Sequence, residues 1–287
     1  MAVTILYGNG LNRLSNAPSW DEVMTHLDPT WSSKGILSSN VPNTIQYEQI
    51  DINTKNNSLT KSLCSIFDVE CDWQNEVYQD LSQRQDVNYI TTNYDLTLES
   101  YFNPKPYNAS SRKDGGEIIY NVHTYYYDKS ANKKVWHIHG DINRPESIIL
   151  GYDHYCKQIS RLNDSLYPPF NYNKRGNNRG KGNDKSYNKE ITWANLFFTD
   201  DIYILGLGLG FEELDLWWLL DKWARYEDKK NKIVYLDADV FNSRISVSSM
   251  LYKCNFKTVL RDFGIEYRKY LSNTWEDAYL QCLHSIP

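Results

Sequence analysis

Short apolar segments alternate with helical stretches along most of this chain, and this alternation is the feature that most limits how it can fold. The segments predicted as strands lie at residues 3–8, 87–92, 117–127, 134–138, 147–150, 201–205, 232–236 and 265–267. Those predicted as helices lie at residues 20–27, 42–66, 73–85, 95–102, 212–226, 242–254 and 273–285. Such alternation is typical of a mostly parallel sheet covered by helices on both faces. We therefore predict an α/β fold with a Rossmann-like, doubly wound sheet and a helical and loop insertion.

The composition allows such a fold and argues against several classes of protein. With 287 residues, of which 41% are hydrophobic, the chain can bury a sizeable core. Its net charge of −5 argues against a general nucleic-acid coat or a membrane-surface binder. No apolar run reaches the ~18 residues of a membrane helix, and the N-terminus lacks a signal-peptide pattern, so a cytoplasmic protein is expected. The five cysteines form no C-x-x-C pair, which argues against a disulfide scaffold and a four-cysteine zinc site.

Glycines follow two of the predicted strands, at the edge where a doubly wound sheet binds its ligands. Gly8, Asn9 and Gly10 follow the first strand, where glycine lets backbone amides approach a pyrophosphate closely. Gly206 and Gly208 stand in a glycine-rich turn after the strand 201–205. The alternative is that these glycines serve only tight turns and strand–helix packing.

A carboxylate, Asp237, follows the predicted strand 232–236. At a strand end it can accept hydrogen bonds from ribose hydroxyls, although it can equally cap the next helix. Together with the glycine turns it predicts a dinucleotide cleft.

Two further strand ends carry polar side chains suited to catalysis. Thr92, Asn93 and Asp95 stand at and after the end of the strand 87–92. His137 and His139 share one face of the strand 134–138 and its continuation, and Gly140 follows. A histidine at the mouth of a sheet can act as a general base near pH 7. The four other histidines are interpreted as structural: His26, His123, His154 and His284.

The order of these motifs resembles that of sirtuins. Y-G-N-G near the N-terminus is followed by T-T-N-Y-D, H-G, L-G-L-G-L and the strand-end acid. The chain is most similar to the sirtuin-like domains of bacterial anti-phage defence proteins, which hydrolyse NAD+. The resemblance spans roughly residues 1–240, within a single sirtuin-like domain at 1–287.

The resemblance implies a role for each motif residue. Asn93 matches the asparagine beside the nicotinamide–ribose bond, Asp95 the acid two residues later, and His139 the catalytic histidine. His137 is implied to be structural or a partner of the site. The residues implied to bind NAD+ are Gly8, Asn9, Gly10, Thr92, Gly140, Gly206, Gly208 and Asp237.

The implied activity is NAD+ hydrolysis to nicotinamide and ADP-ribose, with NAD+ as substrate, no true cofactor and no metal. Protein-deacylating sirtuins carry a zinc module with two C-x-x-C pairs, and its absence from this sequence favours action on NAD+ itself. The alternatives are an NAD-dependent protein deacylase or ADP-ribosyltransferase, and a non-catalytic nucleotide-binding subunit of a complex.

Control of such an activity is expected in trans. The segment after Asp237 is too short for a typical sensor domain, so we expect a homo-oligomer, a separate sensor or activator protein, or both. No membrane and no direct nucleic-acid binding are expected. Residues 171–189, rich in Asn, Lys and Gly, are predicted to form a mobile basic loop, with a lid or partner contact as the alternative. The aromatic runs 125–127 and 217–218 are interpreted as core first and as interface second.

Overall fold

The computed structural model describes residues 1–15, 17–31, 41–54, 59–68, 74–102, 112–166, 192–241 and 247–287, with the backbone alone for 247–252. Its strands are β1 (Val3–Tyr7), β2 (Val87–Thr91), β3 (Arg112–Lys113), β4 (Tyr125–Asp128), β5 (Lys133–His137), β6 (Asp201–Leu205), β7 (Ile233–Val240) and β8 (Glu266–Ser272). Its helices are α1 (Asn9–Asn12), α2 (Trp20–Leu27), α3 (Asn43–Thr54), α4 (Leu59–Phe67), α5 (Glu76–Gln83), α6 (Thr97–Phe102), α7 (Tyr152–Ser165), α8 (Trp193–Thr199), α9 (Leu214–Ala224), α10 (Val247–Asp262) and α11 (Trp275–His284).

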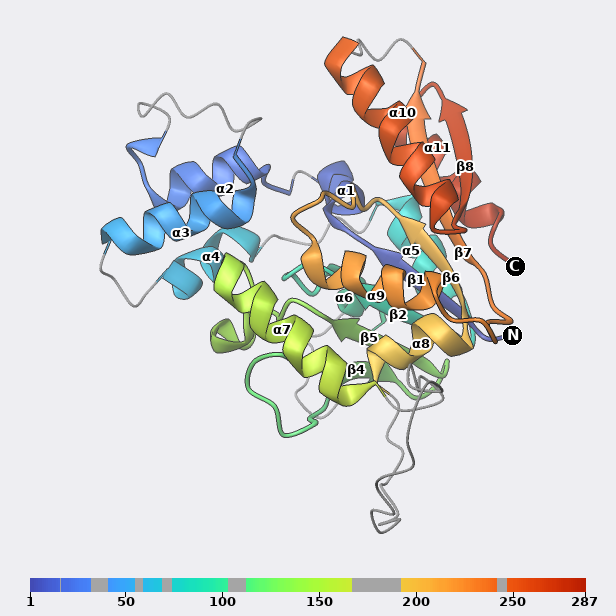
Figure 1. Cartoon of the computed structure of the whole chain (residues 1–287), viewed down its shortest axis with the longest axis horizontal. Helices are drawn as coiled ribbons and strands as arrows, with labels where there is room; N and C mark the ends of the chain where they lie inside the picture. The colour runs from blue at the N-terminus through green and yellow to red at the C-terminus, as the bar shows by residue number, and fades with distance from the viewer. Residues whose placement is uncertain are drawn as a thin grey trace, which may run out of the picture.

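One sheet of eight strands, ordered β3-β4-β5-β2-β1-β6-β7-β8, runs through the molecule (Figure 1). Six neighbouring strands run parallel to one another: β5, β2, β1, β6, β7 and β8. Strands β3 and β4 add an antiparallel edge. Numbered among themselves in chain order, the parallel strands lie as 3-2-1-4-5-6, which is the order of the Rossmann fold. The predicted doubly wound, mostly parallel sheet is therefore confirmed. Its order reverses between β1 and β6, which marks the edge where ligands bind in such sheets.

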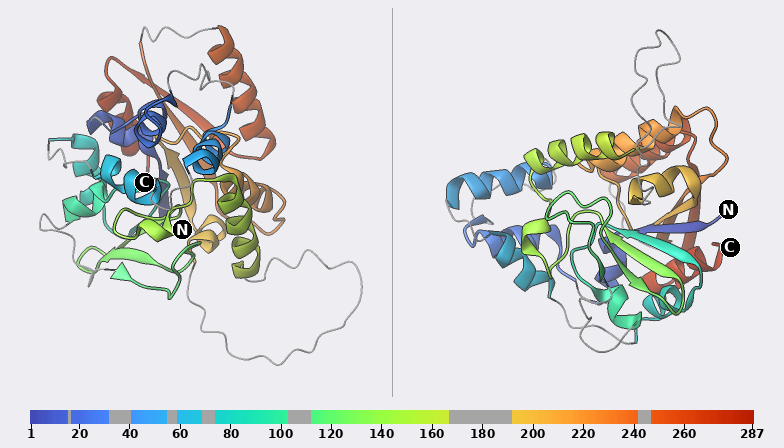
Figure 2. Two further views of the ribbon diagram at one scale, coloured as in Figure 1. Left: turned by 90° about the vertical axis from the view of Figure 1, so that its left-hand side faces the viewer. Right: turned by 90° about the horizontal axis from the view of Figure 1, so that it is seen from below.

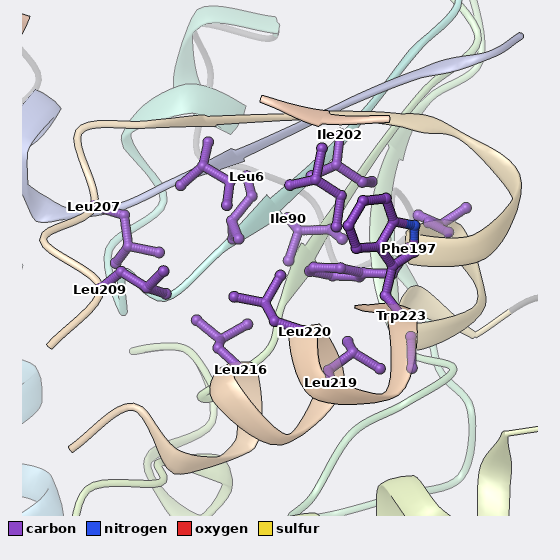
Figure 3. Close-up of a cluster of buried hydrophobic side chains, with 14 of the residues drawn as sticks. Leu6, Ile90, Phe197, Ile202, Leu207, Leu209, Leu216, Leu219, Leu220 and Trp223 are labelled. Atoms are coloured by element: carbon purple, nitrogen blue, oxygen red, sulfur yellow. The ribbon is translucent and has the colours of Figure 1, made fainter. Parts of the chain in front are cut away.

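Helices cover both faces of the sheet because the strands alternate their apolar side chains between the two faces. On one face α7, α8, α9 and α10 pack against the sheet. Figure 3 shows the centre of this cluster, where Leu216, Leu220 and Trp223 of α9 lie under Leu6 and Ile202 of the strands. On the other face α1, α5, α6 and α11 cover a second buried cluster.

The predicted helical insertion is a group of three helices, α2, α3 and α4, which we call the helical module. It has its own small apolar core, which includes Met24, Ile50 and Leu63. That core continues onto Tyr94 and Ile148, in the loops that follow β2 and β5. In Figures 1 and 2 the module therefore lies beside the end of the sheet rather than on either face.

Local signals set where several helices begin. The Ser19 hydroxyl accepts a hydrogen bond from the Glu22 N–H at 3.4 Å while the Glu22 carboxylate accepts one from the Ser19 N–H, a capping box that confirms Ser19 as the cap of α2. Helix α5 is capped by Asn75. Residues 171–189, which are predicted to form a basic loop, lie outside the described residues. The helical region predicted at 42–66 contains two helices, α3 and α4.

Two predicted strands are wrong, one of them in part. The prediction at 117–127 holds only at its end, where β4 (Tyr125–Asp128) begins, because Tyr120 takes a left-handed backbone with φ 59 that interrupts the extended chain. Residues 147–150 follow the 3₁₀ helix Pro145–Ser147 and are buried without joining the sheet. The Ile149 N–H instead donates to the carbonyl of His139 at 2.9 Å, which fastens this loop to the end of β5.

Other elements differ in length from the prediction. Strand β7 continues past Leu236 to Val240 because β8 pairs with it along this whole length, so Asp237 lies within a strand and not at its end. Helix α9 begins at Leu214, later than predicted, and α10 ends at Asp262, later than predicted. Helices α7 and α8 are not anticipated by the sequence. None of the helices in the described part of the chain is long and apolar enough to cross a bilayer.

The aromatic runs contribute to the core. Tyr126 is buried, and Tyr125, Trp217 and Trp218 are partly buried against the cluster under α9. Their use as an interface stays a prediction.

Candidate active site

A cavity of about 530 Å³ opens at the carboxyl ends of the central strands, where the strand order reverses. The turns after β1, β2, β5 and β6 form its walls together with the middle of β7, and the helical module closes one side with Trp20 and Phe67. This is the place where a doubly wound sheet binds a dinucleotide. Most of the predicted site residues line it: Asn9, Gly10, Thr92, Asn93, Asp95, His139, Gly206, Gly208 and Asp237.

Gly8 and Gly140, in contrast, do not line the cavity among the residues that the structure describes. A Cβ on Gly8 would lie 2.7 Å from the Leu207 side chain. Gly140 has a left-handed φ of 88, and a Cβ there would lie 2.3 Å from the carbonyl oxygen of Ser147. Both glycines therefore allow the turns of the site to pack closely.

The turns after β1 and β6 are bonded to each other. The Gly10 N–H donates to the carbonyl of Gly206 at 2.8 Å, and a Cβ on Gly10 would lie 2.6 Å from that oxygen. Gly208 faces open space, since a Cβ there would meet nothing within 4 Å. Gly10 is thus needed for the packing of the turns, whereas Gly208 leaves room in the cavity wall for a ligand to approach the backbone.

Asn93 is held by its backbone and unpaired at its side chain. Its N–H donates to the Thr91 hydroxyl at 3.0 Å, and its carbonyl accepts from His137 Nδ1 at 2.8 Å. The side-chain oxygen and nitrogen of Asn93 are both buried and have no hydrogen-bond partner in the described part of the chain. Leaving such groups unpaired costs about 1–3 kcal/mol, so the arrangement indicates a ligand that completes it.

His137 lies behind Asn93 and forms a buried ion pair. Its Nε2 lies 2.7 Å from Glu99 Oε1, and both side chains are almost fully buried. Burial by itself lowers the pKa of His137, but the charge and hydrogen bond of Glu99 outweigh it and raise this pKa to about 9. Both ring nitrogens therefore carry protons at neutral pH, one donated to Glu99 and one to the carbonyl of Asn93.

His139 faces two carboxylates from the start of α9. Its Nε2 lies 3.0 Å from Asp215 Oδ2 and 3.9 Å from Glu213 Oε2. Burial lowers the pKa of His139, but the charge and hydrogen bond of Asp215, with the charge of Glu213, raise it above its usual value. Within the described residues, the side-chain hydrogen bond of His139 is made at Nε2. When Nε2–H donates to Asp215, Nδ1 is therefore left to accept a proton.

Glu213 is a titratable group that the sequence did not single out. It stands immediately before α9, lines the cavity and accepts a hydrogen bond from the Tyr155 hydroxyl at 3.3 Å. Burial, followed by the charges of Asp215 and Glu212, raises the pKa of Glu213 to about 7 against the opposing charge of His139. In the sequence these acids indicate a favourable start for a helix and groups that could bind hydroxyls. Nothing local shows that His139 lies beside them.

The two predicted aspartates have other partners. Asp95 lines the cavity, but its Oδ1 accepts from the Thr97 N–H at 3.0 Å and its Oδ2 accepts from the Asn12 amide. It therefore fixes the start of α6 and joins it to α1. Asp237 accepts a hydrogen bond from the Tyr267 hydroxyl on β8 and lines the far side of the cavity.

Arg13 is the one cationic side chain among the described residues that line the cavity. It follows α1 and is exposed, at the position where the sequence departs from the G-x-G-x-x-G pattern. The carboxylates of the lining stand on other turns, so a phosphate group would be favoured near Arg13 and disfavoured near Glu213. This uneven distribution of charge favours one orientation of a phosphate-bearing ligand in the cavity, which the glycine motif alone does not indicate.

The cluster of His139, Glu213 and Asp215 also has ligand types that divalent cations accept. One nitrogen or oxygen atom from each lies within 4.8 Å of the others. The 3.0 Å separation of His139 and Asp215 is that of a direct hydrogen bond, which accounts for their approach without an ion. The absence of a metal stays a prediction, and a chelator tests it.

The comparisons with known proteins point to the same part of the fold. Residues 87–175, roughly a third of the chain, match the family model of the SIR2-like domain. This segment contains Asn93, Asp95 and His139. The match supports the sirtuin-like resemblance and points to a family of NAD-dependent enzymes. The search of curated proteins found no match. Fold, site and match thus define a Rossmann-like α/β protein with a SIR2-like segment at the edge of the sheet that holds the candidate site.

Proposed function

We propose that this protein is an NAD+ hydrolase that cleaves the nicotinamide–ribose bond and releases nicotinamide and ADP-ribose. The observation that carries the proposal is the buried, unpaired amide of Asn93, which lines the same cavity as His139 at the binding edge of a Rossmann-like sheet. Hydrogen bonds between this amide and a bound ligand would hold a reacting ribose in the orientation that the reaction requires.

The reaction requires mainly that the protein position the ribose and stabilise the positive charge that forms on it. Nicotinamide leaves as a neutral base while the ribose takes on oxocarbenium character, as in glycoside hydrolysis. Asn93 orients the ribose or the attacking water through its amide. His139, held by Asp215 at Nε2, accepts a proton at Nδ1 from a ribose hydroxyl or from water. Asp95 supports the turn that carries Asn93, since both of its oxygens are already engaged.

The remaining lining residues suit the rest of the dinucleotide. Gly206 and Gly208 give backbone access on the adenosine side, and Asp237 offers a carboxylate to the ribose hydroxyls there. Arg13 would bind the pyrophosphate, because charge-assisted hydrogen bonds to phosphate are among the strongest available to a side chain.

Replacing Arg13 tests this orientation of the substrate. We expect Arg13→Ala to raise KM for NAD+ by about 10- to 100-fold with little change in kcat, since a hydrogen bond between charged groups contributes about 1.5–3 kcal/mol. Steady-state kinetics measure the effect, and Arg225→Ala, at the exposed residue that follows α9, is the control. An unchanged KM would place the pyrophosphate elsewhere.

The direct test of the function is nicotinamide release. Purified protein is incubated with NAD+, and nicotinamide and ADP-ribose are separated and quantified by chromatography. We expect equal amounts of the two products. Bound NAD+ that stays intact under every condition would contradict hydrolysis and favour a non-catalytic nucleotide-binding subunit. Loss of the acyl group from an acyl-lysine peptide in the presence of NAD+, detected by mass spectrometry, would identify a deacylase instead.

The resemblance extends the proposal to a biological role, NAD+ depletion in anti-phage defence. A free NAD+ hydrolase would harm its own cell, so we propose control by self-assembly or by a separate activator. The assay is therefore repeated with the products of neighbouring genes, and the oligomeric state is measured by light scattering. A monomer that consumes NAD+ without help would contradict control in trans.

A further inference from the structure

Two acids flank His139, and the structure gives them different surroundings. Asp215 is fully buried, and its two oxygens accept hydrogen bonds from His139 Nε2 at 3.0 Å and from the Leu216 N–H at 2.9 Å. Glu213 keeps 19% of its side chain exposed and lines the cavity. Asp215 is thus positioned to hold the imidazole, whereas Glu213 can contact a molecule in the cavity.

The surroundings of Glu213 leave it room to act on water. Its Oε2 accepts from Tyr155 at 3.3 Å and lies 3.9 Å from His139 Nε2, a separation too long for a hydrogen bond. The Tyr155 ring also packs edge-on against His139, with 5.1 Å between ring centroids. Tyr155 therefore holds both groups at one wall, beside each other but without a direct bond between them.

Resting on the proposed hydrolysis of NAD+, we propose that Glu213 is a further catalytic residue, the base that takes the proton from the attacking water. The C1′–N bond breaks with its electron pair leaving on nicotinamide, the water oxygen bonds to C1′, and one water proton passes to the Glu213 carboxylate. That proton then returns to solvent, so that NAD+ and water give nicotinamide, ADP-ribose and H+. His139 is left to act on the ribose hydroxyl, and the two bases do not compete for one proton.

The ionisation of Glu213 suits this role. The groups that face it are His139 from the turn after β5, Glu212 from the turn before α9, Asp215 from α9, Tyr155 from α7 and Tyr94 from the turn after β2. Burial and the charges of Asp215 and Glu212 raise the pKa of Glu213 to about 7, against the lowering effects of His139 and Tyr155. A general base with such a pKa works best near neutral pH. The carboxylate form accumulates as pH rises, so the rate of hydrolysis should rise through about pH 7.

The test combines an isosteric change with chemical rescue. Glu213→Gln keeps the acceptor for Tyr155 and removes the base, so we expect kcat to fall by about 10²- to 10⁴-fold. The step in the pH profile near pH 7 that belongs to Glu213 should disappear, which leaves only the rise that belongs to His139. Glu213→Ala opens space beside C1′, where azide can attack without losing a proton. We expect azide to restore nicotinamide release in this variant and to yield ADP-ribosyl azide. Asp221→Asn, at a half-buried position of the same helix that does not line the cavity in the described part of the chain, is the matched control.

Each outcome decides the assignment. Glu213→Gln with the kcat and pH profile of the wild type overturns the role of Glu213 and leaves the proposed function intact. A folded Glu213→Ala variant that azide does not rescue shows a structural role and also overturns it. Activity lost on chelation and restored by Zn²⁺ or Mn²⁺ would assign His139, Glu213 and Asp215 to a metal instead. A wild-type protein that releases no nicotinamide overturns the proposed function, and the base with it.

Discussion

Asn93→Ala is expected to lower the rate of NAD+ hydrolysis by about 10²- to 10³-fold while leaving the protein as stable as before or more so. The loss of rate follows because one preorganised hydrogen-bonding group at a reacting centre typically contributes about 2.7–4 kcal/mol. The gain in stability follows because the Asn93 amide is buried without a partner in the described part of the chain. Alanine removes those unpaired groups and their cost of about 1–3 kcal/mol.

His139→Ala provides the comparison. It should lose activity to a similar degree, but it removes the partner of the buried Asp215 and leaves that carboxylate uncompensated. The variant is therefore expected to unfold at a lower temperature than the wild type. Nicotinamide release and thermal unfolding, measured side by side, separate the two variants. Asn93→Ala with full activity, or with a clearly lowered unfolding temperature, would remove the main support for the site.

The sequence predicts the fold well because the signals for it are local. The strand-forming runs 3–8 and 201–205 are short, apolar and followed by glycine, and each pattern can be seen within a few residues. Parallel strands of this kind need helical crossovers, which sets the layered arrangement. The positions of Asn93 and His139 follow from the same logic, since both stand where a central strand ends.

The remaining features depend on partners that are distant in the sequence. His139 and Asp215 are 76 residues apart, and no local pattern shows that the start of α9 approaches the end of β5. The extension of β7 past Asp237 depends in the same way on pairing with β8. The strand predicted across Tyr120 was wrong because an aromatic-rich segment has the composition of a strand even where its backbone turns. The sequence thus predicted which edge of the sheet forms the site, but it did not show which carboxylates lie beside His139 there.

The buried pair of Glu99 and His137 should control both the stability of the protein and the position of Asn93. We expect Glu99→Gln to lower the free energy of unfolding by about 3 kcal/mol at pH 6.5, because removing one charge from a buried pair leaves the other uncompensated. The carbonyl of Asn93 would then lose a charged donor, the His137 Nδ1–H at 2.8 Å. We therefore expect kcat for NAD+ to fall together with the stability.

The pH dependence gives this prediction a sign that a general packing defect would not reproduce. The pKa of His137 is raised from 6.5 to about 9 in the folded protein, so the folded state holds the proton more tightly than the unfolded state. The contribution to stability is fully present below pH 6.5 and is lost as pH rises through about 9, a change of about 3 kcal/mol. Urea unfolding between pH 6 and 9.5 should show this decline in the wild type and a flatter profile in Glu99→Gln. Glu76→Gln, an exposed change on α5, controls for the loss of one negative charge. Parallel profiles for wild type and Glu99→Gln would mean that His137 is neutral in the fold, and that Asn93 is held by an uncharged hydrogen bond.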